Sequence, residues 1–200
     1  MRTFGAVVIL FSASSVMAEE TRQLDAHEHG VGTLNVAIDG PVVAMAFEAP
    51  GADIVGFEYA AQSDADLAAV EAALALLGEP SSLFALPEAA GCRVETVMAQ
   101  LEMESDHDEH DDHEDHDDHD DHDDHDDHDD HEDHAQEAGH SEFLAEYVFR
   151  CDDSNAVDKI AFPYFDAFPN AQEVDVQVIT ASGATAYEAD RASPLVALER

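Results

Sequence analysis

The segment FLAEYVFRC (residues 143–151) has the clearest strand pattern in the chain. Every second residue from Phe143 to Phe149 is apolar, so one face of an extended segment is apolar along its whole length. Residues 92–101 have a second strand-like pattern. If the two strands pair antiparallel, Cys92 and Cys151 lie at one end, and the intervening residues form a loop at the opposite end.

The middle of that loop, residues 106–134, contains only histidine, aspartate and glutamate and is called the His/Asp tract below. Its nineteen carboxylates repel one another, and it has no apolar side chain to bury, so a long disordered loop is expected. Every third residue is a histidine: His107, His110, His113, His116, His119, His122, His125, His128, His131 and His134.

The composition of the tract indicates metal binding. Zinc takes three or four imidazole, thiolate or carboxylate ligands, and in an extended chain every third side chain returns to the same edge. Zn²⁺ is therefore the expected ion, and Cu²⁺ or Ni²⁺ remains open because copper binds such ligands more tightly. The alternative is a slippage repeat that serves only as a soluble linker.

A second group of ligands stands at His27-Glu28-His29-Gly30. Histidines two apart in an extended segment point to the same side, close enough to chelate one ion. Two ligands are too few for a tight site, and His140 is the only other histidine outside the tract. The sequence predicts a site at His27 and His29 that needs a third ligand, or else an exposed polar arm.

The first eighteen residues, MRTFGAVVILFSASSVMA, predict a secretory signal peptide. Arg2 supplies a positive charge, an apolar run follows from Phe4 to Phe11, and Ala18 ends the small residues at the expected cleavage site. A buried strand is the alternative. No other apolar run approaches the ~20 residues of a membrane span, so no membrane insertion is expected after cleavage.

Residues 19–200 are then expected to form one zinc-binding domain in an oxidising compartment, the periplasm. Residues 104–140 would be a disordered metal-binding loop inserted between two strands. In that compartment a Cys92–Cys151 disulfide is the default, although two cysteines could instead ligate zinc.

Two hairpins and a helix complete the expected fold. Alternating residues predict strands at 34–38 and 42–47, and again at 174–178 and 184–189, each pair joined by a glycine-containing turn. A helix is expected to begin at Ser63, with Asp66 completing a capping box, and to end at Gly78. Its core-facing residues would be Leu67, Val70, Leu74 and Leu77.

Aromatic residues are expected to fill the core. These are Phe57, Tyr59 and the segment from Phe162 to Pro169, which we interpret as a core plug in a turn or short helix. The prediction is an α+β single domain: a mainly antiparallel sheet of about six strands, one main helix and the long His/Asp-rich loop.

Charge and motifs exclude several functions. The formal charge is −40, and it is still −21 without the acids of the tract, which argues against nucleic acid or anionic membrane partners. No His-Glu-x-x-His or Gly-x-Ser-x-Gly sequence occurs, and the tract lacks the glycine of a calcium-binding EF-hand loop. A non-enzymatic protein is expected.

The order of these features resembles the DUF2796 family of zinc-regulated periplasmic proteins, the ZrgA-like family. The resemblance rests on His27-Glu28-His29-Gly30, a Leu34-Asn35-Val36 strand, Gly56-Phe57-Glu58, the two cysteines flanking the tract, and Phe165 to Pro169. His27 and His29 match the family's N-terminal His-x-His-Gly, and the tract matches its variable His-rich loop. His140 stands where relatives often have further histidines.

The resemblance implies a zinc-binding protein that assists uptake through a zinc ABC transporter, with the transporter's substrate-binding component as partner. Capture and delivery of zinc is therefore the leading expectation. A periplasmic buffer that protects against excess zinc, copper or nickel is the alternative.

Overall fold

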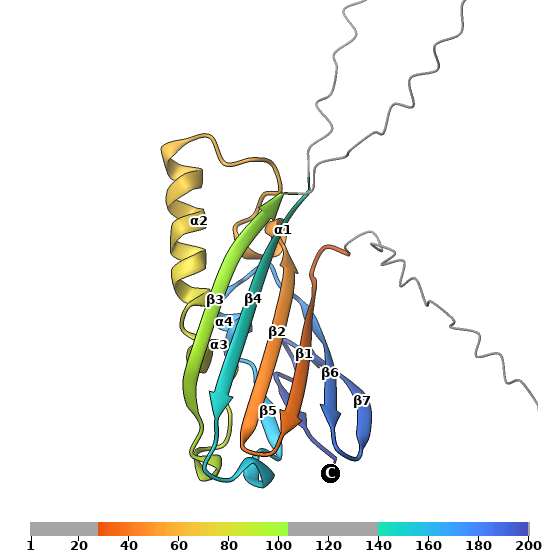
Figure 1. The fold of residues 1–200 in the computed structure, drawn as a ribbon. Helices are drawn as coiled ribbons and strands as arrows, with labels where there is room; N and C mark the ends of the chain where they lie inside the picture. Colours follow the sequence, from red (N-terminus) through yellow and green to blue (C-terminus); the bar gives the residue numbers. More distant parts are fainter. Residues whose placement is uncertain (1–27, 104–139, 200) are drawn as a thin grey trace, which may run out of the picture.

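A six-stranded sheet in the order β3-β4-β2-β1-β6-β7 forms the frame of the molecule (Figure 1). The structure is a computed structural model and describes residues 28–103 and 140–199. The strands are β1 (Val31–Asp39), β2 (Val42–Pro50), β3 (Arg93–Met103), β4 (Ser141–Arg150), β6 (Glu173–Thr180) and β7 (Gly183–Asp190). The expected α+β class and mainly antiparallel six-stranded sheet are confirmed.

Both predicted hairpins are present. β1 pairs antiparallel with β2, and β6 pairs antiparallel with β7. Gly40 has a φ of 54° in the first turn, a conformation that glycine adopts without a steric penalty. The pattern of the two hairpins did not predict how they meet: β1 and β6 pair in parallel, which is the one parallel pair of this sheet.

The antiparallel pairing of β3 and β4 is also confirmed. Arg93 pairs with Arg150 at one end of the ladder, and Met103 pairs with Ser141 at the other. The two cysteines therefore lie at one end of the sheet. The chain leaves β3 and returns to β4 at the opposite end (Figure 1).

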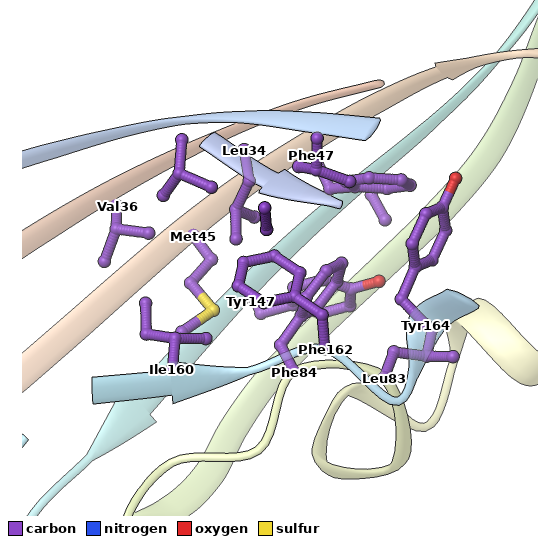
Figure 2. Close-up of a cluster of buried hydrophobic side chains, with 14 of the residues drawn as sticks. Leu34, Val36, Met45, Phe47, Leu83, Phe84, Tyr147, Ile160, Phe162 and Tyr164 are labelled. Atoms are coloured by element: carbon purple, nitrogen blue, oxygen red, sulfur yellow. The ribbon is translucent and has the colours of Figure 1, made fainter. Parts of the chain in front are cut away.

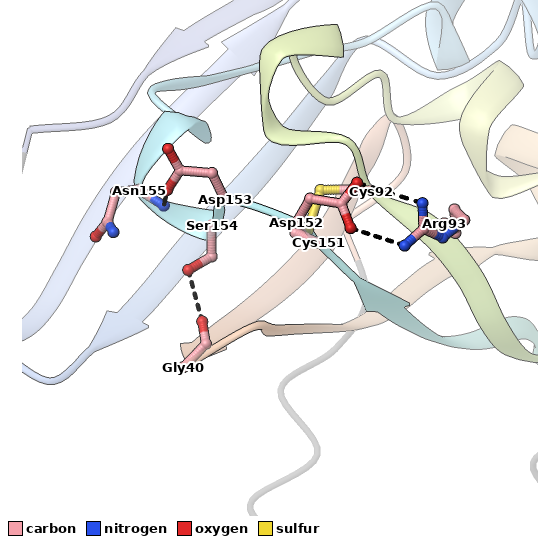
Figure 3. The surroundings of a disulfide bond; sticks show 8 residues. All are labelled: Gly40, Cys92, Arg93, Cys151, Asp152, Asp153, Ser154 and Asn155. Atoms are coloured by element: carbon pink, nitrogen blue, oxygen red, sulfur yellow. Dashed lines mark hydrogen bonds and ion pairs between the residues drawn. A yellow bond between two sulfur atoms is a disulfide. The ribbon is translucent and has the colours of Figure 1, made fainter.

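A disulfide joins Cys92 to Cys151, as expected (Figure 3). Beside it the Arg93 guanidinium donates two hydrogen bonds to the Asp152 carboxylate, at 2.7 and 3.3 Å. Two short 3₁₀ helices flank the bridge, η1 (Glu88–Ala90) and η2 (Ser154–Ala156). The disulfide thus ties the strand pair together at the end remote from the connection between β3 and β4.

The core lies against one face of the sheet. Alternate residues of β1, β2, β4 and β6 are buried there, whereas the residues between them are partly or fully exposed. A two-stranded sheet of β5 (Lys159–Ala161) and β8 (Leu195–Ala197) covers this face together with α3 (Pro80–Leu83) and α4 (Tyr164–Ala167). The sequence did not predict this second sheet, because its strands have only three residues each.

Aromatic rings join the covering elements to the sheet (Figure 2). The Phe84 ring lies 5.2 Å from the Phe47 ring and 6.0 Å from the Tyr147 and Tyr164 rings, between centroids. Phe162 is 2 % exposed, and Tyr164 is fully buried in α4. The segment from Phe162 to Pro169 is therefore a core plug around a short helix, as predicted.

The main helix, α2 (Asp64–Leu77), begins with the predicted capping box. The Ser63 hydroxyl accepts a hydrogen bond from the Asp66 amide, and the Asp66 carboxylate accepts one from the Ser63 amide. The prediction that Leu67 faces the core is wrong, since it is 53 % exposed. Only Ala73 and Leu77 of this helix are buried, so the helix packs mainly through its second half.

The prediction that Tyr59 enters the core is also wrong. Tyr59 is 49 % exposed, and its ring stacks on the Phe57 ring at 4.7 Å between centroids. The two rings cover each other beside α1 (Gly51–Ile54) instead of packing under the sheet. Within residues 28–103 and 140–199, no helix has both the length and the apolar character needed to cross a membrane.

Candidate metal site

Three chain segments that are distant in sequence meet at the end of the sheet opposite the disulfide. β1 and β4 begin there, and β2 ends there and continues into α1 (Figure 1). His29 lies in the turn that leads into β1, His140 directly precedes β4, and Glu58 follows α1 after the bend at Gly56. The topology of the sheet therefore brings two histidines and a carboxylate together.

The carboxylate of Glu58 contacts both histidines. His29 Nε2 lies 2.9 Å from Glu58 Oε1, and His140 Nδ1 lies 3.0 Å from Glu58 Oε2. Each oxygen of the carboxylate thus faces its own imidazole nitrogen. The sequence predicted a site at His27 and His29 with its third ligand left open. The structure brings His29 and His140 to one carboxylate, that of Glu58, which was not predicted as a ligand.

The two nitrogen–oxygen contacts can be compared with the geometry of a zinc site. Zinc binds imidazole nitrogen at about 2.0–2.1 Å and carboxylate oxygen at about 2.0–2.2 Å, so tetrahedral ligand atoms lie roughly 3.3 Å apart. Each imidazole contacts a different oxygen of the carboxylate, and the ligand atoms of the three side chains do not all lie within 4.8 Å of one another. The imidazoles would therefore have to move closer together to share one ion.

The two imidazoles of the cluster are much more exposed to solvent than its carboxylate. The side chains of His29 and His140 are 62 % and 61 % exposed, whereas that of Glu58 is only 13 % exposed. The carboxylate is held at the bottom of the cluster, and both imidazoles stand at the surface. An ion bound here would keep open coordination positions, which suits a site that must take up and release its metal.

A buried carboxylate, Asp53, lies behind the cluster. It is 2 % exposed, and its Oδ1 accepts a hydrogen bond of 2.8 Å from the Gly30 amide. Burial raises the pKa of Asp53, the Gly30 hydrogen bond and the charge of His29 oppose that rise, and the charge of Glu58 adds to it. Asp53 is therefore within electrostatic reach of two members of the site.

The remaining predicted ligands, His27 and the ten histidines of the His/Asp tract, lie outside the described residues. The structure does fix where the segment that contains the tract is attached. That segment, residues 104–139, connects Met103 to His140 at this same end of the sheet. The segment that contains the proposed tract ligands thus ends at a member of the folded cluster.

Glu58 was missed because nothing local distinguishes it from the other acids of the chain. There are 47 aspartates and glutamates, and Glu58 has no histidine at a chelating spacing. The only sequence signal was its place in Gly56-Phe57-Glu58, one of the short segments that support the family resemblance.

Among the described residues, the one group of three possible ligands whose atoms all lie within 4.8 Å of one another is purely acidic. Glu173, Asp175 and Glu188 on β6 and β7 have carboxylate oxygens within 4.8 Å of one another. Burial and the neighbouring acids, Glu188 first among them, raise the pKa of Glu173. Without an imidazole, these side chains match zinc less well than the cluster at Glu58 does.

Comparison with known proteins agrees with the chemistry of the cluster at Glu58. The search of curated proteins returns no match. A family model described as "ZrgA family zinc uptake protein" matches residues 26–198, which include the strands, both cysteines and all three residues of the cluster. The chain therefore belongs to the ZrgA family of zinc uptake proteins.

Proposed function

We propose that the protein is a periplasmic zinc-binding protein that captures Zn²⁺ and assists its delivery to an ABC-type zinc uptake system. The observation that carries this proposal is the carboxylate of Glu58, which faces His29 on one oxygen and His140 on the other. Membership of a zinc uptake family supports uptake as the direction of transport. The disulfide supports an oxidising compartment, and the signal peptide over residues 1–18 would direct the chain there.

The folded site and the His/Asp tract would have different roles. His29, Glu58 and His140, with His27 as a further ligand, form the defined site. The ten tract histidines, from His107 to His134, provide capacity: at three or four imidazoles per ion they would hold about two or three zinc ions. Ligands on a chain without a rigid cage exchange quickly, which suits the collection of a scarce ion.

Delivery of zinc would then depend on where the tract is attached to the folded domain. The last histidine of the tract, His134, is six residues from His140 along the chain, and His140 is a member of the folded site. The open coordination positions at that site would allow the substrate-binding component of a transporter to supply replacement ligands. Cu²⁺ and Ni²⁺ bind the same ligand types, so the supply of metal in the compartment selects the ion.

Calorimetric zinc titration tests the division of roles. Deletion of residues 106–134 is expected to remove most of the zinc stoichiometry, to leave one ion bound at the folded site, and to leave the thermal unfolding transition nearly unchanged. A deletion variant that keeps the full stoichiometry would show that the tract is not the store.

Expression distinguishes uptake from protection. Synthesis of the protein should rise on zinc starvation if it serves uptake. A rise on exposure to excess zinc, copper or nickel would instead identify a protective buffer and overturn the proposed direction.

A further inference from the structure

The short helix α1 contacts the chain next to each of the three residues of the candidate site. It follows β2 directly and precedes Glu58 by a few residues. One of its residues, Asp53, holds the backbone beside His29. Another, Gly51, packs against the backbone beside Glu58 and against the residue that follows His140.

Asp53 fixes the turn that carries His29. Its Oδ1 accepts the Gly30 amide at 2.8 Å, and the Gly30 carbonyl accepts the amides of Gln172 and Glu173 at 2.8 and 2.9 Å. The φ of Gly30 is 93°, a conformation that glycine adopts far more readily than other residues. Hydrogen bonds therefore hold both the amide and the carbonyl of Gly30. They leave the backbone of the neighbouring His29 little freedom to move.

Gly51 allows two other segments to come close to α1. A Cβ atom at this position would collide with the Ser141 hydroxyl and would lie 2.7 Å from the Phe57 carbonyl oxygen. Ser141 follows His140, and Phe57 precedes Glu58. Because Gly51 has no side chain, the backbone of α1 lies close to the residues next to Glu58 and His140. Gly51 therefore sets the separation of these two candidate ligands.

We infer that α1 is the positioning element of the zinc site and that Asp53 is a positioning residue that holds His29 toward Glu58. This inference rests on the proposed function. Asp53 is 2 % exposed, its Oδ1 accepts the Gly30 amide, and its Oδ2 has no hydrogen-bond partner among the described residues. We assign it the role of a positioning residue because its one hydrogen bond is to the backbone beside His29. Residues that orient metal ligands from behind change metal affinity by about 10- to 100-fold when they are replaced.

The test uses the full-length chain with its ten tract histidines replaced by asparagine, so that only the folded site and His27 are titrated. Zinc affinity is measured by competition with a fluorescent zinc chelator. Asp53→Ala is expected to weaken binding about 10- to 100-fold. Asp53→Asn keeps an oxygen that can accept the Gly30 amide, and it should retain affinity to within about threefold.

Two further variants keep the result interpretable. Asp166→Ala removes an exposed aspartate from the first turn of α4, another four-residue helix, and should leave zinc affinity unchanged. Asp53→Ser replaces Asp53→Ala if the latter does not fold, because a serine hydroxyl is too short to occupy the position of Oδ1. Hydrogen exchange at the Gly30 amide should be fast in Asp53→Ala or Asp53→Ser and slow in Asp53→Asn.

Two outcomes would overturn the inference about Asp53 and leave the proposed function standing. Zinc affinity that is unchanged in a folded Asp53→Ala or Asp53→Ser chain would show that Asp53 positions nothing. An equal loss in Asp53→Asn and Asp53→Ala would show that the charge matters and not the hydrogen bond. A tract-substituted parent that binds no zinc would refute the proposed site, and the inference would fall with it.

Discussion

His29 and His140 contact opposite oxygens of a single carboxylate, that of Glu58, at 2.9 and 3.0 Å. One histidine precedes the first strand of the sheet and the other precedes β4, so their proximity depends on the pairing of β1, β2 and β4. The sheet therefore brings two remote histidines to the same carboxylate. At its opposite end the Cys92–Cys151 bridge closes the same strand pair whose connection contains the His/Asp tract.

Replacement of Glu58 should disable the folded site without unfolding the protein. In the chain with the tract histidines replaced by asparagine, Glu58→Gln is expected to weaken zinc binding by at least about 10- to 100-fold, because a neutral amide is a poor zinc ligand. Glu88→Gln makes the same change at an exposed residue near the disulfide and should leave affinity unchanged. Equal zinc affinities for the two variants, measured by chelator competition, would remove Glu58 from the site.

Loss of the disulfide should affect stability but not zinc binding. The bridge joins residues 59 apart in sequence, and in the chain-entropy model a closed loop of this size contributes about 4 kcal/mol. The variant with both Cys92→Ser and Cys151→Ser is expected to lose about that much free energy of unfolding in urea titrations at low temperature. Its zinc affinity should match that of the parent protein. A folded variant with impaired zinc binding would contradict the conclusion that the disulfide and the zinc site, at opposite ends of the sheet, act independently.

Tyr147→Phe should not destabilise the protein. The Tyr147 side chain is 1 % exposed, and its hydroxyl has no hydrogen-bond partner among the described residues. Removal of a buried hydroxyl without a partner is expected to raise the free energy of unfolding by about 1 kcal/mol. Tyr187→Phe is the control: its hydroxyl accepts the Glu199 amide at 3.0 Å, so about 0.5–1.5 kcal/mol should be lost. If urea unfolding showed a loss of stability in Tyr147→Phe and a gain in Tyr187→Phe, these assignments of the two hydroxyl groups would be contradicted.

Alkaline pH should destabilise the protein through its buried tyrosines. Burial raises the pKa of Tyr147 and of Tyr164 well above the ordinary value of about 10. Above that value the unfolded chain releases protons that the folded chain retains, so the free energy of unfolding falls as pH rises. A variant with phenylalanine at both positions should show a shallower fall in unfolding experiments between about pH 9.5 and 11. If the free energy of unfolding fell with pH as steeply in this variant as in the parent protein, groups other than the two tyrosines would be responsible.

The sequence predicted the elements whose patterns are local. The β1–β2 and β6–β7 hairpins, the capping box at Ser63 and the aromatic plug before Pro169 each depend on neighbouring residues, and all four are present. The antiparallel pairing of β3 with β4 was a hypothesis from two strand-like patterns, and it placed both cysteines at one end of the strand pair. The parallel β1–β6 pair could not be predicted, since both strands alternate in the same way and nothing local selects the partner.

The errors came from assigning burial by side-chain type. Leu67 lies in the first turns of α2, but that helix contacts the rest of the protein mainly through its second half, so its apolar side chain faces solvent. Tyr59 stacks on Phe57 at the surface. Apolar residues on a partly covered helix or beside a bend carry no local signal that separates core from surface.

The candidate site was predicted in part. Its histidines could be identified because only three lie outside the tract, and two of these, His29 and His140, meet at Glu58. Glu58 and Asp53 could not be identified, because a carboxylate becomes a ligand or a positioning group only through its contacts in the fold. The roles of His27 and of the tract remain predictions.

The most direct test of the account is the position of zinc in a crystal of the chain with its tract histidines replaced by asparagine, loaded with one equivalent of the metal. Anomalous scattering at the zinc edge should place the ion about 2.0–2.2 Å from His29 Nε2, His140 Nδ1 and a Glu58 carboxylate oxygen. An ion bound elsewhere, at Glu173, Asp175 and Glu188 for example, or no bound ion at all, would contradict the assignment of the zinc site.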